Sequence, residues 1–149
     1  MMQENNPILS QTPKPEVSQV KEAIGFDAYN LPRYFGTAKA ANIALSTTED
    51  AGERIELTKT IREASISIYG LIEALMLDAE DYIPHSKTQD FKDKLEQLKK
   101  REQTVIEHGR FNADEVREDI RYIKKLLKDT NLTELGEKNL IDELDETYL

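Results

Sequence analysis

Apolar residues recur along this chain at alternating spacings of four and three positions. The longest such row lies within residues 57–75, a second lies within residues 91–105, and a short turn that contains Pro84 separates them. A spacing that averages 3.5 places the side chains on one face of a helix, as in a coiled-coil seam. Two such rows joined by a short turn predict an antiparallel helical hairpin, which we assign to residues 47–108.

The same rows are our predicted surface for self-association, because seams of this kind close between chains as well as within them. From Ile66 onward a second row widens the apolar face, and a wider face needs more than one neighbouring helix. The residues of this predicted self-association seam are Leu57, Ile61, Ala64, Ile68, Leu71, Leu75, Phe91, Leu95 and Leu98.

The N-terminal third predicts two helices before the hairpin. Pro15 suits the first position of a short helix and Gly25 its end, and residues 30–32 offer a second start after an aromatic-containing turn. The second helix has alanines in the middle of its apolar row, which lets a neighbouring helix approach closely. Residues 46–48 are good N-caps, so we expect a break near Ser46 and a fresh helix after it.

Two further helices are predicted after the hairpin. Gly109 ends the preceding helix, and Asn112 with Glu115 has the spacing of a capping box at the start of the next one. A weaker pattern predicts a last helix at roughly residues 133–147. Because no stretch shows convincing period-two alternation, the sequence predicts an all-α fold, a helical bundle around a central long antiparallel hairpin.

Composition and charge divide the chain into three parts. Residues 1–14 are rich in Pro, Asn, Gln and Ser and predict a flexible tail, and residues 15–128 form the helical domain. Residues 129–149 hold seven acids against Lys138 alone, which predicts an acidic C-terminal helix or docking segment. The net charge of −9 disfavours non-specific binding to nucleic acid or to an anionic membrane.

The last residues of the chain alternate acidic and apolar side chains. Two interpretations are open: an amphipathic last helix, or a docking peptide that folds on a basic protein partner. The apolar residues that would dock are Leu140, Ile141, Leu144, Tyr148 and Leu149.

Targeting signals and cysteine chemistry are missing from the sequence. No apolar run approaches the roughly 20 residues of a membrane span, and the N-terminus has neither a basic nor an apolar signal region. We therefore expect a cytoplasmic protein, in a bacterial or host cytosol, that does not bind membranes. The absence of cysteine excludes disulfides, zinc-thiolate sites and thiol chemistry, and we expect no cofactor.

One group of potential metal ligands lies at the end of the first hairpin helix. Asp78, Asp81 and His85 have the spacing i, i+3 and i+7, so their side chains would point the same way on a continuous helix. Pro84 interrupts that helix and no second cluster supplies a fourth ligand. We interpret the group as a solvated acidic helix end and predict no metal site.

Arg101 and His108 are the only candidate catalytic pair. Their spacing resembles the Arg-x(4–6)-His motif of the HEPN ribonucleases, and the resemblance implies that His108 moves the 2′-hydroxyl proton while Arg101 holds the phosphate. The other interpretation makes Arg101 a surface cation and His108 a cap beside Gly109 that stabilises the helix C-terminus. Glu102 and Glu107 flank the pair, and no phosphate loop or nucleophile elbow is present, so we predict a non-enzyme.

The order of features in the first third resembles the small terminase subunits of myovirus-type tailed phages. Those proteins show an acidic-aromatic-arginine segment, an alanine-rich helix, a short polar turn and then a long seam. The resemblance implies a non-enzymatic ring that is built on a helical hairpin and binds viral DNA and the large motor subunit. The matching residues here are Asp27, Tyr29, Arg33, Ala38 to Leu45, Arg54, Glu56 and Leu57.

The sequence therefore predicts a non-enzymatic helical protein that forms homo-oligomers or binds a protein partner. A viral DNA-packaging adaptor, which would also bind DNA, is the most specific version. Two alternatives remain: a HEPN-like ribonuclease that uses Arg101 and His108, and an acidic chaperone or antitoxin that masks a basic partner.

Overall fold

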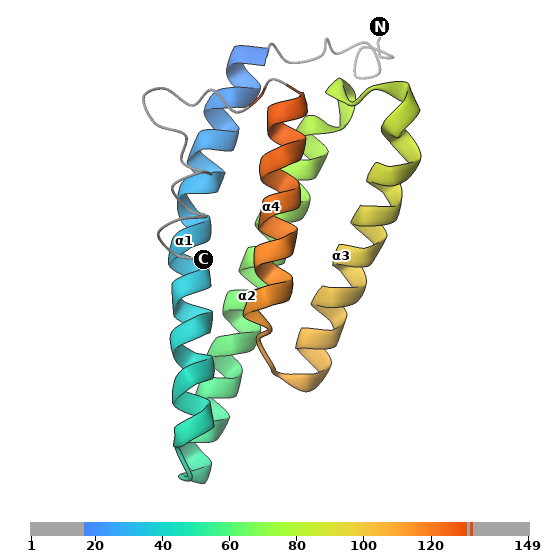
Figure 1. The fold of residues 1–149 in the computed structure, drawn as a ribbon. Coiled ribbons are helices and arrows are strands. Elements are labelled where there is room, and N and C mark those ends of the chain that lie inside the picture. Colours follow the sequence, from blue (N-terminus) through green and yellow to red (C-terminus); the bar gives the residue numbers. More distant parts are fainter. Residues whose placement is uncertain (1–16, 131, 133–149) are drawn as a thin grey trace, which may run out of the picture.

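A computed structural model of the protein describes residues 17–130 and 132. These residues form an all-α bundle without any strand, which confirms the predicted fold class (Figure 1). Two short 3₁₀ helices connect the second and third α-helices. The elements are α1 (Val17–Thr47), α2 (Ala51–Ala79), η2 (Glu80–Tyr82), η3 (His85–Lys87), α3 (Thr88–His108) and α4 (Ala113–Asp129).

Helix α1 is one continuous helix of 31 residues, so the prediction of two shorter helices was wrong. Pro32 lies inside α1, where proline removes one backbone hydrogen bond at a cost of about 3 kcal/mol. Leu31 and Phe35, on either side of it, are both buried. Burial of a large apolar side chain stabilises by roughly 1.5–3 kcal/mol each, so tertiary packing offsets the cost of the proline.

The break between α1 and α2 lies at residues 48–50, slightly later than expected. Asp50, rather than one of the three hydroxyl residues before it, is the N-cap of α2, and its carboxylate accepts a hydrogen bond from the Glu53 amide at 2.8 Å. The hydroxyls of Ser46 and Thr47 instead donate to carbonyls of the last turn of α1. Short side chains of the turn itself therefore form hydrogen bonds with backbone groups at both helix ends.

Arg54 of α2 connects the two helices at this turn through hydrogen bonds. Its Nη1 atom donates hydrogen bonds to the carbonyl oxygens of Leu45 and Thr48, both at 2.9 Å. These carbonyls belong to the end of α1, where no intrahelical donor remains for them. Arg54 thus stabilises the C-terminus of α1 from the second turn of α2.

The connection between α3 and α4 is as predicted. Gly109 ends α3 in the left-handed conformation, with φ of 62°, and the Asn112 side chain caps α4 by accepting a hydrogen bond from the Glu115 amide at 3.1 Å. A Cβ atom at Gly109 would lie 2.6 Å from Cγ2 of Thr58 on α2. Glycine is therefore required here both for its φ angle and for the close approach of this turn to α2.

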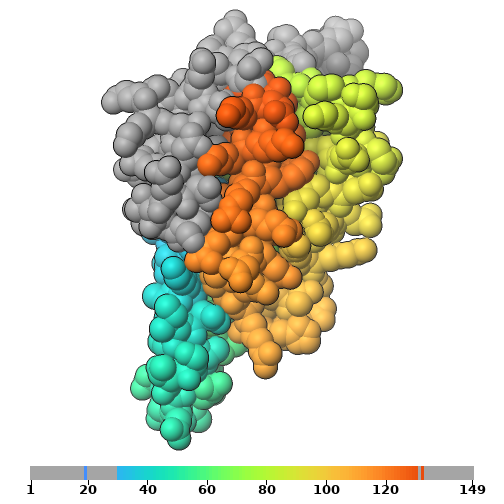
Figure 2. All heavy atoms as spheres, viewed as in Figure 1, coloured from blue at the N-terminus to red at the C-terminus, as the bar shows by residue number. Residues whose placement is uncertain are grey.

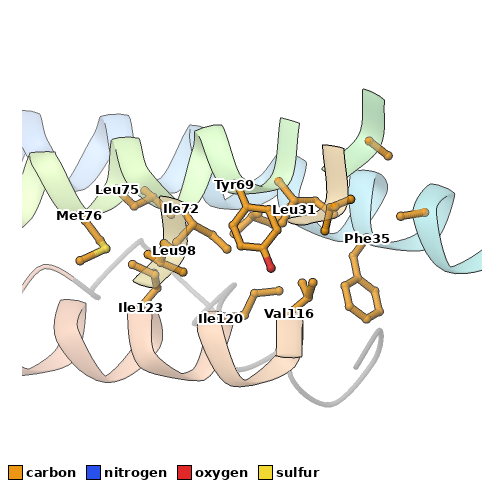
Figure 3. Packing of buried hydrophobic residues seen from close by; sticks show 14 of the residues in the cluster. Leu31, Phe35, Tyr69, Ile72, Leu75, Met76, Leu98, Val116, Ile120 and Ile123 are labelled. Carbon is orange, nitrogen blue, oxygen red and sulfur yellow. The ribbon is translucent and has the colours of Figure 1, made fainter. Parts of the chain in front are cut away.

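Helix α2 is central and contacts the other three α-helices, most extensively α1 (Figure 1). Figure 3 shows Tyr69, Ile72 and Met76 of α2 directed at residues of α4. The hairpin of α2 and α3 is present, but α1 and α2 form the more extensive pair because Ala38 and Ala41 of α1 let the two helices approach closely.

The predicted seam packs inside a single chain. Six of its nine residues are buried in the core, and the other three are partly buried against that core. In this fold the seam side chains already have partners, so a contact between copies requires a different surface. The buried members are Ile61, Ala64, Ile68, Leu75, Phe91 and Leu98, and the partly buried ones are Leu57, Leu71 and Leu95.

Candidate functional site

Helices α1 and α2 extend past the rest of the bundle as a two-helix projection (Figures 1 and 2). The α3–α4 turn crosses them near Thr58 on α2, which Gly109 approaches closely, and near Phe35 on α1, whose ring meets that of Phe111 edge-on with centroids 5.4 Å apart. Twelve residues of α1 follow Phe35, a rise of about 18 Å. We call residues 38–57 the arm.

The arm has a narrow interior, and its exterior carries two exposed isoleucines. Ala38 and Ala41 are buried between its helices, and residues 51–56 are all exposed. Ile43 is 58% exposed and Ile55 is 68% exposed, the two highest values among the large apolar side chains of the described residues. Large contiguous apolar patches mark contact surfaces, whereas single exposed aliphatic side chains are common, so Ile43 and Ile55 are candidate contact residues on a projecting element.

Charged side chains of both signs lie on and beside the arm. Glu49 and Asp50 lie in the turn at its tip and are exposed, whereas Lys59 is exposed at its base and Lys39 is half-buried there. Arg54, near the tip, is held by the carbonyls at the end of α1. The exposed carboxylates of Glu53 and Glu56 continue the acidic side chains from the tip along α2, and Glu63 is exposed close to Lys59.

A second notable feature is a charged group inside the bundle, which we call the Asp119 cluster: Tyr69, Lys94, Arg101 and Asp119. Asp119 is fully buried on α4. Its Oδ1 atom accepts hydrogen bonds from Lys94 Nζ, at 2.8 Å, and from Arg101 Nη1, and the Tyr69 hydroxyl lies 3.4 Å from Oδ2 and donates to it. Side chains from α2 and α3 thus bind one carboxylate of α4, and such a buried hydrogen-bonded network is suited to holding the three helices together.

Protonation in and around this cluster follows its burial and charges. Burial raises the pKa of Tyr69, and the charge of Asp119 raises it further. Burial acts to lower the pKa of Arg101, but the hydrogen bond to Glu118 and the charge of Asp119 outweigh it and the pKa is raised. The hydrogen bond from Arg101, at 3.0 Å, lowers the pKa of Glu118. Tyr69 therefore stays protonated and Arg101 stays cationic near neutral pH.

Arg101 and His108, the candidate catalytic pair, have different surroundings. The Arg101 side chain is 17% exposed and bonds to Asp119 and Glu118 on α4. His108 is exposed at the end of α3, directly before Gly109. The guanidinium that would hold a phosphate is already bound to two carboxylates of its own chain, which favours a structural role for Arg101.

The predicted acidic helix end is distributed over three elements. Asp78 lies in α2, Asp81 in η2 and His85 in η3, so the three residues do not share one helix face. Within residues 17–130 and 132, no group of three His, Cys, Asp or Glu side chains is placed to hold a metal ion. Likewise, none of the helices described here combines the length and the apolar character that crossing a membrane requires.

Glu73 on α2 and Glu102 on α3 form a carboxyl pair that the sequence did not predict as a pair. Burial raises the pKa of Glu73, the charge of Glu102 and a hydrogen bond with it raise it further, and Lys99 partly opposes them. Glu73 Oε2 is buried without a hydrogen-bond partner. The only signal in the sequence was that Glu102 interrupts the apolar row of its helix.

A cavity of about 450 Å³ lies where the turn between α2 and α3 meets the end of α4. Phe91 and Tyr122 line it together with two lysines and two aspartates. The pKa of Tyr122 is raised by burial and then by the charge of Asp90. Side chains of both charges line this cavity, and they do not define one class of ligand.

No protein-family model, curated protein or solved structure matches this chain. The fold defines an all-α helical bundle, and function has to be argued from its own surfaces. Several predicted features lie outside the described residues: the tail at 1–14, and within the 129–149 segment the docking residues Leu140, Ile141, Leu144, Tyr148 and Leu149.

Proposed function

We propose that this protein is a non-enzymatic helical interaction protein that binds a protein partner through the arm, residues 38–57. The observation that carries the proposal is the exposure of Ile43 and Ile55 on a two-helix projection. The seam that periodicity alone assigned to self-association is used by the core, so the arm replaces it as the contact surface.

The charged groups of the described residues support a non-enzymatic role. The most buried carboxylate, Asp119, is neutralised by Lys94 and Arg101, and both cations are held by it. Catalytic groups need a substrate-accessible face, whereas Asp119 is fully buried. These residues hold helices together and leave recognition to the exterior of the bundle.

A viral DNA-packaging adaptor remains the more specific version of this proposal. It rests on the resemblance to small terminase subunits, and two of the matching segments, Ala38 to Leu45 and Arg54 to Leu57, lie in the arm. In that version the arm contributes to assembly and further segments bind DNA. Binding of the purified protein to duplex DNA in a mobility-shift assay tests this version separately.

The proposed function is tested by native mass spectrometry of the tagged protein purified from its own host, because that measurement reports partner and stoichiometry together. Ile55→Asp is expected to abolish the complex, and Leu77→Asp is the matched control because Leu77 is 56% exposed on the same helix but far from the arm. Unchanged circular dichroism shows that both variants fold. A complex that survives Ile55→Asp contradicts the proposal.

A further inference from the structure

We propose that the acidic segment of residues 133–149 binds to α4 of its own chain, running back along a row of cations on that helix. We call this row the basic row: Arg117, Arg121, Lys124 and Lys128. The inference goes beyond the proposed function, because it concerns a different surface and a partner within the same chain. Three features support it: the charge of the row, the way in which the chain leaves α4, and the positions of opposite charges on the two sides of that exit.

The basic row lies on one side of α4. Its members have the spacing i, i+4, i+7 and i+11, which places their side chains along a single stripe of the helix. Arg121 and Lys128 are exposed, and Arg117 and Lys124 are half-buried. The guanidinium of Arg117 lies 5.9 Å from the centre of the Phe35 ring, so the first residue of the row borders α1.

Positive charge is in excess along this part of α4. Residues 120–128 contain four cations and no acid, although the whole chain has a net charge of −9. The acids that precede them lie in the first turn of α4 or bind Arg101 of α3: Asp114, Glu115, Glu118 and Asp119. Of these, Asp114 pairs with Arg117 at 2.9 Å. Like charges three or four residues apart destabilise a helix by about 0.2–0.5 kcal/mol per pair, so an acidic ligand along the row would offset this repulsion.

The helix dipole accounts for the end of the row and not for the rest of it. Lys128 lies in the last turn of α4, where a cation stabilises the helix C-terminus. The effect falls off within that turn, and the other three members of the row lie before it. Asp129 follows Lys128 directly but lies about 100° around the helix from it. The row as a whole therefore matches an elongated acidic ligand better than it matches a helix cap.

The chain leaves α4 through a turn that is bound to the last turn of the helix. The Leu132 amide donates a hydrogen bond to the Leu127 carbonyl at 2.7 Å, and the Thr130 amide donates to the Leu126 carbonyl at 3.0 Å. Bonds of this kind close a helix C-terminus and reverse the chain. Leu132 is fully buried, so the residue directly before the acidic segment is anchored on the bundle. The segment therefore starts beside the row, at an effective concentration in the millimolar range.

Opposite charges lie at equal distances on the two sides of this turn. Counted from residue 131, Lys128 is three residues before the turn and Glu134 is three residues after it. Arg117 is fourteen residues before the turn and Asp145 is fourteen residues after it. Because two antiparallel helices rise by the same amount per residue, such residues lie at the same height. The helix that the sequence predicts at roughly 133–147 would thus bring an acid to each end of the row.

The middle of the row has one favourable pair and one unfavourable pair in this register. Arg121 is ten residues before residue 131 and Asp142 is eleven residues after it. Lys138 comes level with Lys124, and their charges repel. On a helix Asp142 lies on the same side as Glu134 and Asp145, so three acids can meet three cations at once.

Other polyanions fit the row less well than this segment does. Residues 133–149 carry six carboxylates against one lysine, and they belong to the same molecule as the row. A phosphate backbone or an acidic protein would have to displace them, and the net charge of −9 opposes the approach of either. The observations therefore favour the chain's own acidic segment.

Paramagnetic broadening in the NMR spectrum of the full-length chain tests the docking. The chain has no cysteine, so Thr147→Cys supplies a single site for a nitroxide spin label. Thr147 lies sixteen residues past residue 131, so the docked segment carries the label to the height of Arg117. Amide signals around Arg117 are then expected to broaden more than those around Lys128. Broadening that is strongest around Lys128, as expected for a segment that does not dock, overturns the proposal.

Charge reversal in the labelled chain tests the row and the register. Arg121→Glu combined with Lys128→Glu, the row variant, is expected to lose the broadening around Arg117. Adding Asp142→Lys and Glu134→Lys to the row variant reverses both partners and should restore it. The matched control is Lys92→Glu combined with Lys100→Glu, which makes the same change of charge at exposed positions of α3 and should keep the broadening. Unchanged broadening in the row variant overturns the proposal, and a failure of the four-fold variant to restore it overturns the register.

Two further measurements separate the other occupants. In a mixture of spin-labelled chain with unlabelled ¹⁵N-enriched chain, no broadening is expected, and broadening around Arg117 would place the segment on another copy and overturn binding within the chain. Duplex DNA is the second probe. If the labelled wild type shows no broadening around Arg117 and binds a duplex that the row variant does not bind, a phosphate backbone is the occupant and the proposal is overturned.

Discussion

The guanidinium of Arg101 on α3 donates a hydrogen bond to the fully buried carboxylate of Asp119 on α4. Lys94 of α3 donates to the same oxygen, and the Tyr69 hydroxyl of α2 donates to the other one. The backbones of α3 and α4 otherwise approach each other less closely than each approaches α2. The carboxylate of Asp119 therefore joins α4 to α2 and to α3 through side chains.

Removing Asp119 should destabilise the protein strongly. In Asp119→Ala, two largely buried cations lose the carboxylate that neutralises them, and the free energy of unfolding should fall by about 3 kcal/mol. Urea unfolding followed by circular dichroism measures the change.

Glu118→Ala is the matched control for this experiment. It removes the exposed partner of Arg101 on the same helix, and exposed ion pairs contribute little, so a change of no more than about 0.5 kcal/mol is expected. Equal effects of Asp119→Ala and Glu118→Ala would show that the Asp119 cluster does not hold the helices together.

Substitution of Arg101 and His108 separates a structural pair from a catalytic one. Arg101→Ala leaves Asp119 with Lys94 and Tyr69 only, and should lower the free energy of unfolding by about 2 kcal/mol. His108→Ala removes an exposed side chain and should change it by less than about 0.5 kcal/mol. Equal stability of both variants, with loss of an RNA-cleaving activity in each, would support the ribonuclease instead.

Periodicity predicted the fold class because the apolar row that a helix buries can be recognised within the sequence of that helix alone. The buried seam residues Ile61 and Ile68, and the capping pair Asn112 and Glu115, were all visible locally. The continuity of α1 through Pro32 was not visible. The burial of side chains on both sides of the proline stabilises the continuous helix, and local helix propensities do not include this tertiary contribution.

The site was less predictable because its partners come from different helices. Asp119 lies between apolar positions of α4, beside Ile120, and this was its only signal in the sequence. One interpretation of the sequence made Arg101 a surface cation, whereas Arg101 and Lys94 both bind the buried Asp119. The arm exists because the α3–α4 turn crosses α2 at Thr58, well short of its N-terminus. How far one helix pair extends past another depends on tertiary packing, and it cannot be predicted from the local pattern of a single sequence.

Substitution of Gly109 and of Gly70 by alanine should change the free energy of unfolding in opposite directions. Gly109 has φ of 62° and packs against Thr58, so Gly109→Ala should lower the free energy of unfolding by about 2 kcal/mol or more. Gly70 is exposed in α2 with open space around it, and Gly70→Ala should raise it by about 0.5–1 kcal/mol through helix propensity. Thermal and urea unfolding measure both changes, and the prediction fails if Gly109→Ala is as stable as the wild type.

The carboxyl pair of Glu73 and Glu102 should make stability depend on pH. Because the folded pKa of Glu73 lies above its ordinary value of 4.5, the folded state binds the proton more tightly than the unfolded state does. The contribution of Glu73 to the free energy of unfolding is fully present below the ordinary pKa and is lost as the pH rises through the pKa of the folded state. Glu73→Gln should therefore stabilise the protein at neutral pH, by about 0.5 kcal/mol for this half-buried pair.

The gain from Glu73→Gln should shrink as the pH falls and vanish below the ordinary glutamate pKa, where Glu73 of the wild type is protonated in both states. Urea unfolding of both proteins at several pH values measures this difference. Glu96→Gln is the control, because Glu96 is exposed beside Lys100 and its loss should not stabilise the protein at any of these pH values. A gain for Glu73→Gln that stays constant with pH would mean that the charge of Glu73 is not its source.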